Sequence, residues 1–287
     1  MIIVKLQWWL WNQMFQYAFA KAISLRNKVD FRLNIFDYKT YFRSLELDIF
    51  SIENNYASSK EIPFYEKLIS KNKYINHLFR RCKNICKKLD KNYYKESYLM
   101  FDEKLLTIKS WYIEGQFQTE KYFINFENII RKDFSFKYHP SIQNQNIIDI
   151  ISKYNSVSIH IRRGDYLLDN NLSYHWICSM DYYKDAISFI KSHVKSPVFF
   201  FFSDDMNWVK ENFKESKSNY YIDRNTWKNS YEDMRLMSLC KHNIVANSSF
   251  SWWWAWLNNN KDKIVIAPKK WFKKEDMDIV PDWRVKI

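Results

Sequence analysis

The second half of the chain alternates short apolar runs with longer amphipathic stretches, and this rhythm constrains the fold more than any other feature of the sequence. The apolar runs predict strands at residues 157–161, 198–203, 220–223, 243–246 and 263–267. The stretches between them predict helices at residues 181–194, 206–213, 231–240 and 250–257. Strands and helices that alternate in this way form a doubly wound parallel sheet, so we predict an α/β fold.

The first half begins with a similar unit. Residues 1–7 predict a strand, and residues 12–26 carry one apolar stripe at helical spacing. Farther on, helices are predicted at residues 61–71, 76–89 and 119–132, and a strand at residues 111–117. A polar stretch around Pro140 is the candidate linker. We therefore predict two domains, residues 1–140 and residues 141–287.

Composition limits the classes of protein that the chain can represent. No segment of about twenty apolar residues is present, and Lys5 and Gln7 interrupt the apolar start of the chain. We therefore expect no membrane span and no signal peptide, and a protein that stays in the cytoplasm or at most on a membrane surface. The 45 basic and 32 acidic residues give a net charge of +13, which favours nucleic acid, anionic lipid or a small anionic ligand as partner. No nucleic-acid-binding module is recognisable, which disfavours the first of these.

Residues 71–91 form the densest basic stretch and interleave Arg80, Arg81 and other basic residues with Leu78 and Ile85. This pattern predicts an amphipathic helix with a cationic face. Two interpretations stay open: the helix rests on an anionic membrane surface, or its charged face is simply solvated.

Cysteine spacing provides no metal site. Cys82 and Cys86 have no second pair and no histidine cluster beside them, so these two residues, Cys178 and Cys240 are all interpreted as free thiols. No Asp-x-Asp sequence ends a predicted strand, and the chain contains neither an HExxH sequence nor a P-loop. We therefore expect neither a metal ion nor a cofactor.

The sequence HIRRGDY at residues 160–166 comes at the end of a predicted strand, where α/β proteins place their ligand sites. Arg162 and Arg163 offer permanently charged forks whose geometry suits phosphate oxygens. Asp165 either orients an arginine or accepts a proton, and His160 lies beside them. These residues predict a phosphorylated ligand.

Two further polar segments follow strands of the same predicted sheet. Asp204 and Asp205 follow the strand at residues 198–203, where a carboxylate could accept two hydrogen bonds from guanine, bind a metal ion or cap the next helix. Ser248 and Ser249 precede the helix at residues 250–257, and hydroxyls at a helix N-terminus suit an anion such as a diphosphate. Because the carboxyl ends of parallel strands share one edge, we expect one site.

In four ordered motifs that cover nearly its whole length, the chain resembles the bacterial α-1,2-fucosyltransferases of glycosyltransferase family 11. The motifs are KLQ with NQMFQYA near the N-terminus, HIRRGDY, FFSDD at residues 201–205, and YEDM at residues 231–234 leading to ANSSFSWW at residues 246–253. The resemblance implies a GT-B-like fold of two Rossmann-like domains, the first on the acceptor side and the second binding GDP-fucose. It also implies an inverting, metal-independent transfer of L-fucose from GDP-fucose to the 2-hydroxyl of a terminal β-galactoside, in the synthesis of a bacterial surface polysaccharide.

The same resemblance implies roles for the residues around the diphosphate. Arg162 would contact the β-phosphate as a catalytic residue, with Arg163 beside it. Ser248 and Ser249 would assist in holding the diphosphate.

For the rest of the donor, Asp204 or Asp205 together with His160 would hold the guanosine. Asp165 is the candidate general base that removes the proton of the acceptor hydroxyl.

The N-terminal motif, in which Asn12 and Gln13 are assigned to substrate binding, departs from the family. Where the family has QGGLGN, this chain places Trp8, Trp9 and Trp11. Glycine in such a turn permits a positive φ and a close approach of the backbone to a ligand, and an indole is expected to allow neither. We therefore predict that the fold is kept while donor or acceptor binding, and stability, are impaired.

Trp176, Trp227 and Trp254 also stand where the family has glycine. These departures explain together why the chain has 2 glycines and 13 tryptophans. Two alternatives to a fucosyltransferase stay open: another nucleotide-sugar glycosyltransferase, and a non-catalytic basic protein that binds an anionic polymer or a membrane.

Overall fold

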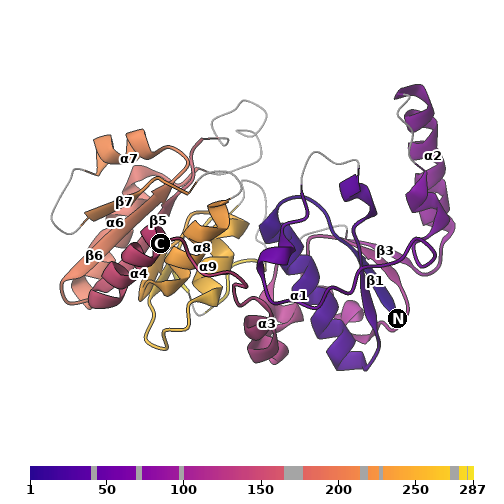
Figure 1. Cartoon of the computed structure of the whole chain (residues 1–287), viewed down its shortest axis with the longest axis horizontal. Coiled ribbons are helices and arrows are strands. Elements are labelled where there is room, and N and C mark those ends of the chain that lie inside the picture. The colour runs from indigo at the N-terminus through magenta and orange to yellow at the C-terminus, as the bar shows by residue number, and fades with distance from the viewer. Residues whose placement is uncertain are drawn as a thin grey trace. The chain divides into compact units, whose positions relative to one another are not determined.

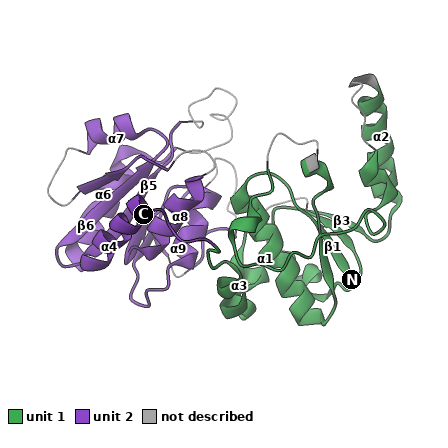
Figure 2. Ribbon diagram, viewed as in Figure 1, with its two compact units in different colours: residues 1–137 green, residues 138–287 purple. Residues whose placement is uncertain are grey.

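The computed structural model describes residues 1–39, 44–68, 73–96, 100–164, 177–213, 219–225, 229–271, 278–282 and 284–287. The chain forms two compact units, Met1–Lys137 and Tyr138–Ile287, which Figure 2 shows in separate colours. Each unit contains a parallel sheet with helices packed on it, which confirms the predicted α/β, GT-B-like fold class.

The sheet of unit 1 has the strand order β2-β1-β4-β3 in the described residues, and its strands pair in parallel. The strands are β1 (Ile2–Lys5), β2 (Phe31–Asn34), β3 (Tyr93–Lys95) and β4 (Tyr112–Glu114). Helix α1 (Leu10–Asn27) connects β1 to β2, and most of its side chains are buried. The predicted opening strand and helix are confirmed.

The other helical segments of unit 1 are mostly shorter than the sequence predicts. The α-helices are α2 (Lys73–Leu89) and α3 (Glu127–Asp133). The 3-10 turns are Phe36–Lys39, Leu47–Ile49, Phe64–Lys67, Glu103–Thr107, Glu120–Tyr122 and Ile124–Phe126. The prediction of one helix at residues 119–132 is wrong, because two 3-10 turns precede α3 and Phe123, with ψ of 0°, separates them. The helix predicted at residues 61–71 is reduced, in its described part, to one 3-10 turn after Pro63.

The sheet of unit 2 has the strand order β10-β9-β8-β5-β6-β7 in the described residues, again with parallel pairs (Figure 1). The strands are β5 (Asn155–Ile161), β6 (Pro197–Ser203), β7 (Asn219–Ile222), β8 (His242–Ile244), β9 (Val265–Ala267) and β10 (Val285–Lys286). The helices are α4 (Ile142–Lys153), α6 (Met180–His193), α7 (Met206–Asn212), α8 (Ser230–Leu239) and α9 (Ser249–Leu257). Sequence analysis predicts these elements closely, except α4 and β10.

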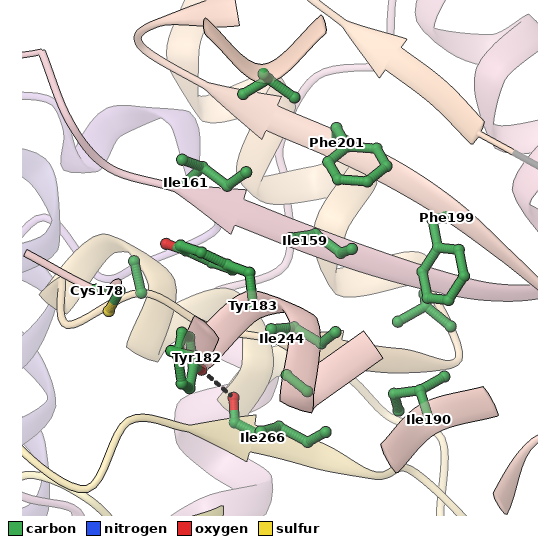
Figure 3. Close-up of a cluster of buried hydrophobic side chains, with 14 of the residues drawn as sticks. Ile159, Ile161, Cys178, Tyr182, Tyr183, Ile190, Phe199, Phe201, Ile244 and Ile266 are labelled. Atoms are coloured by element: carbon green, nitrogen blue, oxygen red, sulfur yellow. Dashed lines mark hydrogen bonds between the residues drawn. The ribbon is translucent and has the colours of Figure 1, made fainter. Parts of the chain in front are cut away.

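Strand β5 presents different side chains on its two faces, because successive residues of a strand point to opposite sides. Ile159 and Ile161 belong to the hydrophobic cluster that packs under α6, drawn in Figure 3. On the other face Ser158 accepts a hydrogen bond from the Asn243 amide at 2.9 Å, and His160 lies next along the strand. The apolar face fixes the strand, and the polar face leads to its carboxyl end.

The order of strands creates a switch point beside β5. Ile161 pairs with Ser203 of β6 on one side, and Ile159 pairs with Ile244 of β8 on the other. The chain therefore leaves β5 toward β6, β7 and later returns to its opposite side as β8, β9. In open parallel sheets ligands bind in the crevice outside the carboxyl ends of the strands at such a point.

A buried cluster of charges holds the sheet of unit 1 to α2. Lys5 Nζ of β1 lies 2.8 Å from Glu66 Oε2 and 2.8 Å from Asp37 Oδ2. Lys87 Nζ of α2 lies 2.8 Å from Glu66 Oε1 and 2.6 Å from Glu114 Oε2. Burial alone would raise the pKa of Glu66, but Lys5 and Lys87 outweigh it and lower this pKa to about 2. The cluster is stable only while every charge keeps its partners.

We predict that Glu66→Gln lowers the free energy of unfolding at pH 7 by on the order of 3 kcal/mol, since it removes the buried carboxylate that Lys5 and Lys87 share. The pKa of Glu66 is lowered by folding, so its contribution is present above about pH 4.5 and is lost as the pH falls toward 2. Urea unfolding at several pH values measures both effects. Asp282→Asn is the control, because the Asp282 side chain is fully exposed in its 3.6 Å pair with Lys286. Equal losses in the two variants would contradict the prediction.

The turn between β1 and α1 holds Trp8 in the left-handed region, at φ of 65°. The expectation that an indole cannot occupy this position is therefore wrong. The backbone carbonyl of Trp8 accepts hydrogen bonds of 3.0 Å from Gln13 Nε2 and from Tyr38 Oη. After the turn, the Leu10 amide donates a hydrogen bond of 3.0 Å to Glu46 Oε2. These contacts impose the turn, and Trp8 adopts it at a steric cost of about 1–2 kcal/mol.

We predict that Trp8→Gly is more stable than Trp8→Ala by about 1 kcal/mol, because both variants remove the indole but only glycine takes a positive φ without strain. The same pair of substitutions at Trp11, inside helix α1, should give the opposite order, with alanine more stable by about 1 kcal/mol. Chemical unfolding of the four variants makes the comparison. The same order at both positions would refute the assignment of strain to Trp8.

Candidate functional site

The three polar segments predicted to meet do lie at the carboxyl ends of neighbouring strands. Arg162 and Arg163 follow β5, Asp204 and Asp205 follow β6, and the segment 247–249 follows β8. These three strands are consecutive in the sheet of unit 2, and Figure 1 labels β5 and β6. The switch point beside β5 thus carries the candidate residues that the structure describes in this unit.

Asp204 joins the ends of β5 and β6. Its Oδ2 lies 3.2 Å from Arg162 Nη1, and its Oδ1 accepts a hydrogen bond of 2.9 Å from the Arg163 amide. A Cβ at Gly164 would approach Asp204 Oδ2 to 2.9 Å, which is closer than Cβ atoms normally come. Glycine is needed here for close approach of the carboxylate, so one of the two glycines of the chain has a clear structural reason.

Asp205 caps helix α7 and helps to place Arg163. Its carboxylate accepts a hydrogen bond of 3.2 Å from the Trp208 amide, which realises the capping alternative. The Asp205 Oδ2 atom also lies 3.7 Å from Arg163 Nε. The guanidinium of Arg163 stacks 4.0 Å from the Trp208 ring centre. Sequence analysis did not identify Trp208, although its place one turn into the helix after Asp204 and Asp205 is a usable signal.

His160 ties the end of β5 to helix α9. Its Nδ1 and Ser251 Oγ share a hydrogen bond of 2.6 Å, and Tyr183 donates one of 3.1 Å to its carbonyl. Burial, together with the charge of Arg162, lowers the pKa of His160 to about 3. The imidazole is therefore neutral at physiological pH and almost fully buried, so we assign it to positioning. Sequence analysis did not assign a role to Ser251.

The N-terminus of α9 faces the same edge. Ser248 is its N-cap residue and makes no side-chain capping bond, and Ser249 is the first residue of the helix. The amide groups of a first helical turn have no acceptor within the helix and favour an anion. Because Ser251 in this turn is bonded to His160, the helix end is fixed beside β5. The Asn247 side chain is committed elsewhere, since it donates to the Trp271 carbonyl at 3.0 Å.

Asn12 and Gln13 belong to unit 1, at the start of α1. The side-chain oxygen Oδ1 of Asn12 accepts a hydrogen bond of 2.7 Å from Gln118 Nε2. Gln13 is fully buried and bonds the carbonyls of Trp8 and Ser44 and the amide of Glu46. A residue so enclosed supports the turn, and its assignment to substrate binding stays a prediction.

Asp165, Trp176 and Trp227 lie outside the described residues. Within the described part of the chain, no group of three or more His, Cys, Asp and Glu side chains is placed to hold a metal ion. The cysteines, Cys82, Cys86, Cys178 and Cys240, are free, as predicted. Nor does any described helix combine the length and apolar character needed to span a bilayer.

The edge therefore offers two guanidinium groups in fixed positions and the positive end of a helix. Arg162 and Arg163 are each about one-quarter exposed in their side chains, so they can reach a ligand without leaving their carboxylate partners. Such an arrangement can neutralise the charge of a diphosphate in its bound state or as it departs from a sugar.

Two solved structures resemble this chain at TM-scores below 0.5. One is FUT1 of Arabidopsis thaliana, solved as a mutant with GDP, which has a TM-score of 0.48 and 11% identity over 92% of this chain and 69% of that chain. The other is NodZ from Bradyrhizobium, with a TM-score of 0.47 and 11% identity over 88% of this chain and 92% of that chain.

Sequence relatives are closer. An alpha-1,2-colitosyltransferase of Escherichia coli is 35% identical over 96% of this chain and 94% of its own length. The O-antigen biosynthesis glycosyltransferase WbnK of Escherichia coli is 35% identical, with 92% of each chain covered. The galactoside alpha-(1,2)-fucosyltransferase 1 of Leontocebus fuscicollis is 26% identical over 56% of this chain and 48% of its own length. The model of Glycosyl transferase family 11 matches residues 1–285, which confirms the resemblance of the motifs. The chain therefore belongs to glycosyl transferase family 11.

Proposed function

We propose that the protein is an inverting glycosyltransferase that moves L-fucose from GDP-fucose to the 2-hydroxyl of a terminal β-galactoside. The acceptor oxygen attacks C1 of fucose from the side opposite the diphosphate. The bond from C1 to the β-phosphate oxygen breaks, and GDP leaves with the electron pair. The proton of the acceptor hydroxyl passes to a base, for which Asp165 is the candidate.

The observation that carries the proposal is the pair Arg162 and Arg163 beside the N-terminus of α9, at the switch point of a family 11 chain. GDP gains negative charge at its β-phosphate as the bond to fucose breaks. Fixed positive groups at that place stabilise the transition state more than the ground state. We propose that these groups supply the charge that a metal ion supplies in other nucleotide-sugar enzymes, so that neither a metal nor a cofactor is required.

Guanine recognition is proposed for the carboxylates after β6. The two oxygens of Asp204 already hold Arg162 and the Arg163 amide, but an ionised carboxylate has about four acceptor positions. Asp204 can therefore still accept from the N1–H and amino group of guanine. Ser248 and Ser249 are proposed to bind the diphosphate, and His160 to hold both sides of the site in place.

A colitosyl donor is the second candidate. It is favoured by the 35% identity to an alpha-1,2-colitosyltransferase over 94% of that protein. Colitose differs from fucose by the loss of the 3-hydroxyl, so one pocket could accept both sugars. The match to an O-antigen glycosyltransferase supports a surface polysaccharide as the acceptor class. Family membership favours both candidates over a non-catalytic basic protein.

We predict that incubation with GDP-fucose and lactose yields a 2-fucosylated product and free GDP, and that a chelator does not change the rate. Parallel reactions with GDP-colitose decide between the donors, and the shift in melting temperature with GDP against UDP tests the nucleotide.

A variant with glycine at positions 8, 9 and 11 enters the same assay, because we propose that the three indoles weaken substrate binding. Equal rates before and after this change would refute that part, and transfer from a UDP-sugar alone would refute the donor.

For the diphosphate contact, we predict that Arg162→Lys weakens GDP binding by about tenfold and Arg162→Ala by up to about a hundredfold, because a lysine keeps the charge but loses the paired hydrogen bonds. Calorimetric titration with GDP measures the affinities without requiring turnover. Arg131→Lys is the matched control, since Arg131 belongs to unit 1 and forms an ion pair with Glu127 within helix α3. Unchanged GDP affinity in both Arg162 variants would remove Arg162 from the site.

A further inference from the structure

Helix α2 is held to unit 1 by ion pairs of Lys83 and Lys87. Lys87 reaches Glu66 and Glu114 at 2.8 Å and 2.6 Å, and Lys83 Nζ lies 3.5 Å from Glu66. Just beyond its C-terminal end, Asp90 accepts a hydrogen bond of 2.8 Å from Tyr65. The basic residues predicted to form one cationic face therefore do not all face solvent, because Lys83 and Lys87 point inward to buried carboxylates.

The outward side of α2 is apolar along one row. Leu78, Ile85 and Leu89 follow one another at spacings of seven and four residues, which places them on the same helical face. Their exposed fractions are 59%, 58% and 75%. Figure 1 shows α2 as a rod that stands apart from the sheet of unit 1, with one end near β3. Three large aliphatic side chains thus stay in contact with water along nearly three turns of helix.

A row of positive charges runs beside the apolar row. Arg81 and Lys88 are exposed, and each lies three residues after Leu78 or Ile85, hence on the adjoining strip of the helix. Helix α2 contains no aspartate or glutamate. An exposed apolar row beside basic residues, on a helix without acidic residues, is complementary to an anionic lipid surface, whose interior is apolar and whose phosphate layer is negative.

We propose that α2 is a membrane-docking helix that lies on an anionic lipid bilayer, with Leu78, Ile85 and Leu89 in the acyl region and Arg81 and Lys88 at the phosphates. A second copy of the chain fits this face less well, because pairing two apolar rows would bring the positive rows together. The ion pairs of Lys83 and Lys87 with Glu66 set the rotation of the helix about its axis, so that the apolar row faces outward. The docking role is independent of the proposed sugar donor.

The test is co-sedimentation of the full chain with vesicles of phosphatidylglycerol and phosphatidylcholine, compared with phosphatidylcholine alone. We expect binding to the anionic vesicles that decreases with salt. The double variant Arg81→Gln, Lys88→Gln should lower the partition coefficient on the order of thirtyfold, since each basic residue near an anionic surface contributes about a factor of five. The triple variant Leu78→Gln, Ile85→Gln, Leu89→Gln removes the apolar row. Combined with the double charge variant, it should abolish the vesicle binding that the double variant retains.

Matched controls change exposed basic and apolar side chains outside helix α2. Lys60→Gln with Lys153→Gln removes two exposed charges, and Ile142→Gln removes an apolar side chain that is 79% exposed. These should bind as the parent chain does, and melting curves verify that all variants fold. Equal vesicle binding by the α2 variants and the controls would overturn the proposal. The proposal would also be overturned if the parent chain did not bind vesicles and instead formed a concentration-dependent dimer that the triple variant at Leu78, Ile85 and Leu89 loses.

Discussion

The parallel pairing of β5 with both β6 and β8 is the constraint on which the candidate site depends. Because Ile161 pairs with Ser203 and Ile159 with Ile244, the segments that follow these strands must leave the sheet at one edge. The apolar face of β5 fixes this register, since a slip of one residue would move Ile159 and Ile161 out of the core cluster of Figure 3. Packing of the core therefore positions the arginines, and the arginines themselves contribute charge.

How far the sequence predicts this arrangement differs between the units. In unit 2 the apolar strands and amphipathic helices are long enough to be recognised, so the meeting of residues 162–163, 204–205 and 248–249 follows from topology alone. The partners that fix these residues do not follow. The stacking of Arg163 on Trp208 and the hydrogen bond of His160 to Ser251 join different elements. The place of Trp208 after Asp205 suggests that this side chain lies nearby, but its spacing does not show which residue it contacts.

Unit 1 is less predictable for a related reason. Its strands β2 and β3 have four and three residues, too few to show a period, and several of its connecting segments are 3-10 turns. The orientation of α2 illustrates the point. The sequence shows basic and apolar stripes but not which stripe faces inward, because that choice depends on Glu66 and Glu114, which come from other segments. Here buried carboxylates reverse the usual rule that the apolar face of a helix packs on the core.

The tryptophans at family glycine positions act by two different physical routes. At Trp8 the hydrogen bonds of Gln13 and Tyr38 to its carbonyl impose a positive φ, so the cost is local backbone strain and the turn survives. Trp254 lies inside α9, where φ is helical and any residue fits the backbone. Its indole is fully buried, and its Nε1–H has no hydrogen-bond acceptor among the described residues, whereas Trp252 donates to the Ile279 carbonyl at 2.6 Å. The cost at Trp254 is thus desolvation of a polar group, of about 1–3 kcal/mol. It falls on the helix whose first turn holds the proposed anion site, so the strain in unit 1 and the desolvation in unit 2 are separate costs.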